Sequence, residues 1–248
     1  MSEPVRIAMW SGPRTISTAM MRSFGSRGDC AVTDEPFYGA FLKATGDRQP
    51  MADEVIASMD CAWDSVAETM RGPVPDGRPI WYQKHMPHQM VGPVDIGDFP
   101  DHAHAFLIRD PARVIASYAE KRVAVDLDDL GLARQCDYFE RIADRRGTAP
   151  PVIDSGDVLA NPESVLTSLC AALGIAWDPA MLQWAPGLRP TDGIWASHWY
   201  NAVAASSGFA PPPTASPELD AGHAALADRA RPYYDRLKAH RLTRSMRT

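Results

Sequence analysis

The stretch VRIAMWSGPRTISTAMMRSFG, residues 5–25, decides the fold. Its apolar run Val5–Trp10 is typical of a buried strand and ends at a Gly-Pro turn. A helical pattern follows over residues 17–27. A strand that enters a helix through such a turn is a common phosphate site, because the helix N-terminus offers free backbone N–H groups. The stretch therefore predicts an anion site in the turn.

This turn carries a cation but lacks the residues of an ATP loop. Arg14 supplies a permanent charge and a planar set of donors. The ATP loop G-x-x-x-x-G-K-[ST] needs a second glycine and a lysine, and neither follows Gly12. The pattern thus disfavours a P-loop kinase that uses ATP and magnesium, which stays as an alternative. The other alternative is a plain turn in which Ser17 or Thr18 only caps the helix.

Strands and helices alternate along the rest of the chain. This order predicts an α/β fold of three layers, with a mostly parallel sheet of about five strands between helices, similar to that of P-loop NTPases. We expect one domain over 1–248, with a core at about 5–180 and a C-terminal loop and helix, 186–248, that complete the site. Residues 186–217 are rich in Pro, Gly and Ser and predict a long functional loop or a poorly ordered lobe. The predicted strands are 5–10, 30–33, 80–85, 103–109 and 152–154, and the predicted helices include 53–70, 127–146, 162–173 and 218–240.

Composition limits the class of protein. The 248 residues include 45% apolar and 23% charged residues, and the net charge is −6. These values are ordinary for a soluble globular protein and argue against a general nucleic-acid or membrane binder. Four scattered cysteines fit a reduced, cytoplasmic setting. We expect no signal peptide and no membrane span, because no apolar run is long enough.

A second basic signal lies in FLIRDPARVIASY, residues 106–118. Arg109 ends a predicted strand, and Ser117 lies eight residues later on the next helix. Together they could bind one phosphate, with charge from the arginine and a directed donor from the hydroxyl. Alternatively, Arg109 pairs with Asp110 or Glu120.

Four segments together resemble the sulfotransferase family. GPRTIST is similar to its 5′-phosphosulfate loop, RDPARVIAS to its 3′-phosphate motif and QKHMP to the stretch that carries a catalytic histidine. GDVLANPESVLTSLCAALGI is similar to the segment after the last core strand. The matches keep the family order over about residues 5–180.

The resemblance implies a donor, an acceptor and a set of binding residues. The donor is 3′-phosphoadenosine 5′-phosphosulfate, its product is adenosine 3′,5′-bisphosphate, and no metal is required. The acceptor is a hydroxyl or amine of a small molecule, and a homodimer is the oligomer to consider. A nucleotide-binding protein of the same fold without turnover remains an alternative. The implied cofactor-binding residues are Gly12, Pro13, Arg14, Thr15, Ile16, Ser17, Thr18, Arg109, Ser117, Arg189 and Trp195.

The acceptor must lose a proton, and two residues are candidates for the base. His85 matches the family histidine, and Glu35 lies where other branches carry a glutamate. Alternatively, His85 is a strand-end histidine that only forms hydrogen bonds, and Glu35 ties down its own loop. Arg14 would act with the base by stabilising charge on the leaving group.

The prediction also includes an aromatic wall for the acceptor pocket, and the sequence differs from the family pattern at three points. Phe37, Tyr38 and Phe41, with Trp63, would line the acceptor pocket beside Glu35 and His85, unless they belong to the core. Ile16 replaces the usual glycine of the loop, and Gln83 replaces a lysine. The Gly-rich C-terminal element of the family has no clean match, so Arg189 and Trp195 are assigned to it by position.

Overall fold

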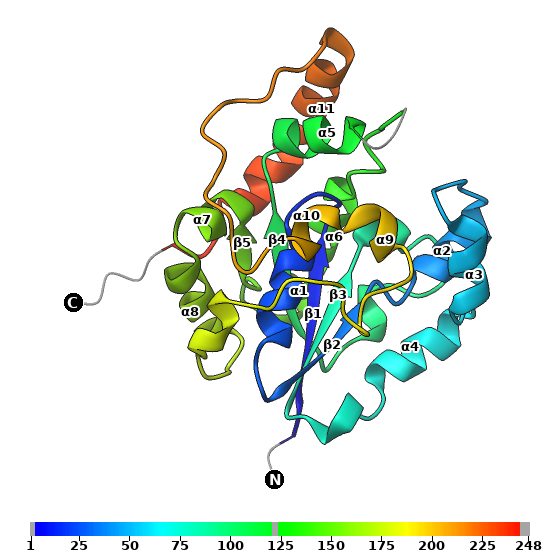
Figure 1. Ribbon diagram of the computed structural model, residues 1–248, viewed down its shortest axis with the longest axis vertical. Helices are drawn as coiled ribbons and strands as arrows, with labels where there is room; N and C mark the ends of the chain where they lie inside the picture. The colour runs from blue at the N-terminus through cyan, green and yellow to red at the C-terminus, as the bar shows by residue number, and fades with distance from the viewer. Residues whose placement is uncertain (1–2, 121–123, 244–248) are drawn as a thin grey trace.

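The computed structural model describes residues 3–120 and 124–243. Its centre is a parallel sheet with the strand order β2-β3-β1-β4-β5 (Figure 1). All five predicted strands are present, and the predicted α/β architecture with helices on both faces is confirmed. The strands are β1 (Val5–Ser11), β2 (Cys30–Asp34), β3 (Ile80–His85), β4 (Ala103–Ile108) and β5 (Val152–Asp154).

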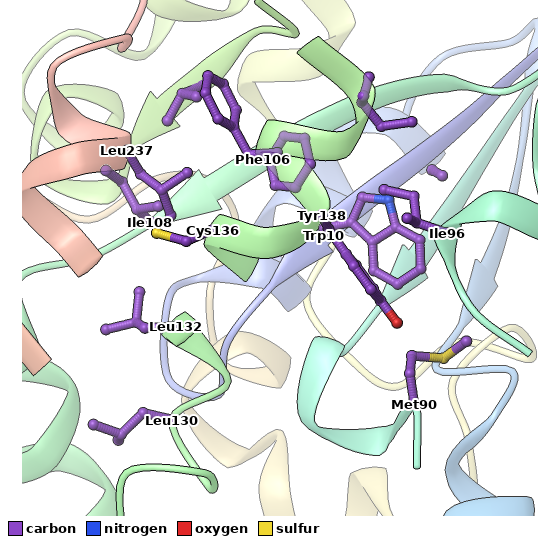
Figure 2. Close-up of a cluster of buried hydrophobic side chains, with 14 of the residues drawn as sticks. Trp10, Met90, Ile96, Phe106, Ile108, Leu130, Leu132, Cys136, Tyr138 and Leu237 are labelled. Carbon is purple, nitrogen blue, oxygen red and sulfur yellow. The ribbon is translucent and has the colours of Figure 1, made fainter. Parts of the chain in front are cut away.

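Alternation along β1 divides the core into two apolar layers. Ile7 and Met9 face the layer that packs against α1 (Ser17–Gly25) and α8 (Pro162–Ala172), whereas Ala8 and Trp10 face the opposite layer. Figure 2 shows this opposite layer, in which Trp10 meets Tyr138 of α6 (Leu132–Arg146) edge to face, with ring centroids 5.0 Å apart. The remaining helices are α2 (Tyr38–Thr45), α3 (Ala52–Ser58), α4 (Trp63–Arg71), α5 (Pro111–Ala119), α7 (Ser155–Ala160), α9 (Ala196–Trp199), α10 (Asn201–Ala204) and α11 (Ala221–Lys238).

The prediction of one continuous helix over 53–70 is wrong, because the chain forms two helices there, α3 and α4. Asp60 explains the break. Its carboxylate accepts hydrogen bonds from the backbone N–H of Ala62 and from the Ser65 hydroxyl. These local bonds favour a new helix start over continuation of the first helix.

The C-terminal segment crosses the carboxyl edge of the sheet (Figure 1). Within the range 186–217, predicted as a loop or lobe, the chain forms α9 and α10. Two contacts fix the segment to the body of the protein. Asp192 forms a buried two-bond ion pair with Arg22 of α1, at 2.6 Å for each bond, and Gln183 pairs with Gly208. The segment therefore has a defined path above the strands.

Within the described residues, no helix is both long enough and apolar enough to span a membrane.

Candidate active site

A cavity of about 360 Å³ lies at the carboxyl edge of the sheet. In open parallel sheets this edge is where ligands bind. Its walls include Pro13 after β1, Glu35 after β2, Met86 after β3 and Arg109 after β4. The segment 192–208, which carries α9 and α10, covers the cavity, and we call it the covering segment. The turns after these four strands thus face one crevice.

The loop after β1 has a left-handed backbone at two positions. Arg14 has φ 57° and Ile16 has φ 65°. A left-handed residue other than glycine costs about 1–2 kcal/mol, and such strain is concentrated at functional sites. Ile16 thus keeps the backbone shape that a glycine adopts easily, in spite of its side chain. Ile16 is also the N-cap of α1, and no side chain caps this helix.

Two arginines, Arg14 and Arg109, meet in one half of the cavity. Arg14 Nε donates to Ser117 Oγ at 3.0 Å, and Arg109 Nη1 donates to the backbone oxygen of Arg14 at 2.6 Å. Among the described residues, neither arginine forms an ion pair with a carboxylate. Burial lowers the pKa of both, and for Arg109 the nearby Arg113 and Arg14 lower it further. Both stay protonated at neutral pH. Two neighbouring cations that form no ion pair within the described part of the chain favour the binding of an anion.

The other half of the cavity holds a buried charge cluster. Lys84 Nζ donates to Asp34 Oδ1 at 2.8 Å and to Glu35 Oε1 at 2.7 Å. The Tyr200 hydroxyl lies 2.7 Å from the same nitrogen. Gln89 Nε2 donates to the second oxygen of Glu35 at 2.5 Å. Three distant parts of the chain therefore meet around one ammonium group.

Burial and pairing fix the protonation of this cluster. Burial opposes the charge on Lys84, but Asp34 and Glu35 outweigh it and hold the pKa of Lys84 well above its usual value. Burial raises the pKa of Asp34, although Lys84 opposes the shift. Burial, and then the charge of Asp34, raise the pKa of Tyr200 well above 10. Lys84 and Tyr200 are thus proton donors at neutral pH.

Comparison with known proteins agrees with this architecture. The model of the sulfotransferase domain family matches residues 5–241. The chain belongs to this sulfotransferase family. Its fold is similar to that of a sulfotransferase from Alicyclobacillus acidocaldarius, with a TM-score of 0.55, 14% identity and 98% of each chain covered.

Two curated relatives are also similar in sequence. They are the branched-chain-amino-acid aminotransferase-like proteins 1 and 2 of Arabidopsis thaliana, 35% and 34% identical over 97% and 94% of this chain. The chain spans 43% and 41% of their lengths.

Most of the predicted site residues of this sulfotransferase domain line the cavity, but several do not. Gly12 and Thr15 do not line the cavity, but their contacts support the loop after β1. A Cβ at Gly12 would lie 2.5 Å from the Leu130 carbonyl oxygen, and Thr15 Oγ1 donates to the Gly12 oxygen at 2.8 Å. Arg189 donates to the Ala185 oxygen and lies outside the cavity. The predicted residues that line the cavity are Pro13, Arg14, Ile16, Ser17, Thr18, Glu35, Tyr38, Arg109, Ser117 and Trp195.

His85 does not fit its predicted role as the base. It is fully buried on the opposite face of β3, stacked on Trp10 with ring centroids 4.7 Å apart, and its Nε2 lies 3.2 Å from Gln83 Oε1. Burial, together with His102 and His104, holds the pKa of His85 well below its usual value. Phe37, Phe41 and Trp63 likewise pack into the apolar clusters rather than into the cavity wall.

The residues that the sequence reasoning missed are Lys84, Gln89 and Tyr200. Strand alternation would have found Lys84, because the neighbouring His85 must face the other side of the sheet. Met86, His88 and Gln89 also line the cavity, but they follow the end of β3, and the last two lie in the short 3₁₀ helix Pro87–Gln89. No local pattern marks Tyr200, which reaches Lys84 from 116 residues away.

No group of three or more His, Cys, Asp or Glu within 3–120 and 124–243 is arranged to hold a metal ion.

Proposed function

We propose that the protein transfers a sulfuryl group from 3′-phosphoadenosine 5′-phosphosulfate to a hydroxyl or amine of a small molecule. The observation that carries this proposal is the convergence of Arg14, Arg109 and Ser117 on one cavity that also contains Glu35. The uncapped start of α1 adds backbone N–H donors on the same side. These residues fit a donor that carries two separate phosphates.

The two halves of the cavity have different roles in this proposal. We call the half that contains Arg14 and Arg109 the donor half, and the half that contains Lys84 and Glu35 the acceptor half. When bound, the donor supplies an electrophilic sulfur and a bisphosphate leaving group. Arg14 would stabilise the negative charge that develops on that leaving group, and Arg109 with Ser117 would bind the 3′-phosphate. Ser17 and Thr18 would add donors from the first turn of α1. Trp195, from the covering segment, would exclude water from the cavity.

Glu35 is the base that we assign. Its carboxylate lines the cavity, and each oxygen keeps a lone pair after accepting from Lys84 or Gln89. It would accept the proton of the acceptor. Lys84 stays protonated and also lies 3.4 Å from Thr18 Oγ1 at the donor loop. It would therefore stabilise negative charge between the two halves, as a donor and not as a base.

Calorimetric titration with adenosine 3′,5′-bisphosphate tests the donor site. We expect binding without magnesium in the original protein and in Arg141→Ala, a surface control whose arginine pairs with Asp95 outside the cavity. Arg109→Ala should bind at least tenfold more weakly, since one charge-assisted contact is worth about 1.5–3 kcal/mol. Preference for ATP with magnesium would instead favour the kinase.

Release of labelled sulfate from the donor tests the base. Glu35→Gln should retain bisphosphate affinity and lose about 10²–10⁴-fold in rate. Bisphosphate binding without any transfer of the labelled sulfuryl group, either to water as sulfate or to a panel of phenols and alcohols as sulfate esters, would favour the inactive nucleotide-binding alternative. An unchanged rate in Glu35→Gln would exclude Glu35 as the base.

A further inference from the structure

The Tyr200 hydroxyl has three partners and is buried within the charge cluster. It donates to Asp34 Oδ2 at 2.6 Å and accepts from Lys84 Nζ at 2.7 Å. Trp195 Nε1 lies 3.1 Å from it and is a further donor. The hydroxyl thus joins the covering segment directly to the carboxylate of Asp34 and the ammonium group of Lys84.

The contacts around Lys84 restrict the orientation of its ammonium group. Its ammonium group has three protons, and four acceptors surround it. Asp34, Glu35 and Tyr200 lie at 2.7–2.8 Å, and Thr18 Oγ1 lies at 3.4 Å. Loss of the Tyr200 oxygen would release one proton donor. Lys84 could then turn away from Glu35, because the side chain is buried but its stem is flexible.

The covering segment has other attachments that do not need this hydroxyl. Arg22 pairs with Asp192, and the backbone N–H of Trp184 donates to the Ser207 oxygen at 3.1 Å. The ring of Tyr200 also packs in an apolar cluster with Tyr38 and Trp195. Removal of the hydroxyl alone should therefore leave the segment in place and disturb the cluster.

We propose that Tyr200 is a positioning residue that orients Lys84 and Asp34, so that Lys84 fixes the carboxylate of Glu35 for the acceptor. This inference rests on the proposed function, in which Glu35 is the base. It makes the acceptor half of the site dependent on a residue from the covering segment. The donor half, built from Arg14 and Arg109, does not depend on Tyr200.

Tyr200→Phe tests the proposal, because it removes the hydroxyl and keeps the ring. The matched control is Tyr234→Phe, since the Tyr234 hydroxyl also donates to a buried aspartate, Asp154 Oδ2 at 2.7 Å, outside the cavity. We expect release of labelled sulfate to water to fall at least tenfold in Tyr200→Phe, with bisphosphate affinity within twofold of the original. The control should change neither quantity.

An unchanged rate in Tyr200→Phe would overturn the proposal, as would equal losses of rate and of bisphosphate affinity. Hydrogen exchange of peptides around Glu35 and Lys84 is a readout that needs no turnover. Exchange there should be faster in Tyr200→Phe than in the original or in Tyr234→Phe, and equal exchange would contradict the positioning role. If the original protein transfers the labelled sulfuryl group neither to water nor to any phenol or alcohol of the panel, the proposed function fails, and exchange alone decides the role of Tyr200.

Discussion

Replacement of Lys84 by methionine should cost about 3 kcal/mol of unfolding free energy at pH 7. The Lys84 side chain is 1% exposed, and its ammonium group pairs with Asp34 and Glu35, whose side chains are 1% and 9% exposed. Methionine keeps most of the stem packing, so the loss comes from two buried carboxylates without a cation. Removal of one partner of a buried pair costs about 3–5 kcal/mol. We take the lower value because Tyr200 and Gln89 still donate to the carboxylates.

Urea unfolding followed by tryptophan fluorescence measures this loss. The matched control is Lys43→Met at the exposed end of α2, which should change stability by less than about 0.5 kcal/mol. The pH dependence gives a second check. A carboxyl group with a raised pKa in the folded state stabilises the fold most below its unfolded pKa, and this contribution is lost as the pH rises through the folded value. Burial raises the pKa of Asp34, so the deficit of Lys84→Met should shrink as the pH falls from 7 towards 4.

Two results would refute this reasoning. One is a loss in Lys84→Met below about 1 kcal/mol at pH 7, which is too small for an unpaired buried charge. The other is a deficit that stays constant on acidification, because the carboxylates would then not be its source.

Two further predictions concern the loop and the buried histidines. Ile16→Gly should be more stable than Ile16→Ala by about 1 kcal/mol in urea unfolding. Both variants lose the isoleucine packing, but only glycine relieves the left-handed backbone at φ 65°. The opposite order would contradict strain at this position. Burial lowers the pKa of His102 to about 4 and of His104 to about 3. These histidines therefore stabilise the fold above their unfolded pKa of about 6.5, and each should lose about 2 kcal/mol of stability between pH 7 and pH 5. His104→Gln should flatten that part of the stability profile relative to the original protein, and an equal slope in both would count against the assignment.

The strands and the donor loop could be predicted because their signals are local. Short apolar runs that end at turns mark β1 and β4, and the turn after each carries Arg14 or Arg109. Helix boundaries were less predictable where a periodic pattern crosses a local competitor. The apolar spacing over 53–70 continues through Asp60, but the side-chain bonds of Asp60 end one helix and begin another.

The acceptor half could be predicted only in part, for two physical reasons. A shift of one residue along a strand reverses the face of the sheet, so the similarity of QKHMP to a histidine motif led to His85, although its neighbour Lys84 faces the cavity. Tyr200 belongs to a segment whose path depends on tertiary contacts such as the Arg22–Asp192 pair. No spacing in the sequence encodes that path.

The covering segment is anchored near both ends, by Asp192 on Arg22 and by Gly208 on Gln183. The strands below it do not depend on the side chains between these anchors for their own pairing, which runs through the sheet. Substitutions between residues 193 and 207 can therefore change the lining of the cavity on this side while the strands and the loop after β1 keep their own contacts.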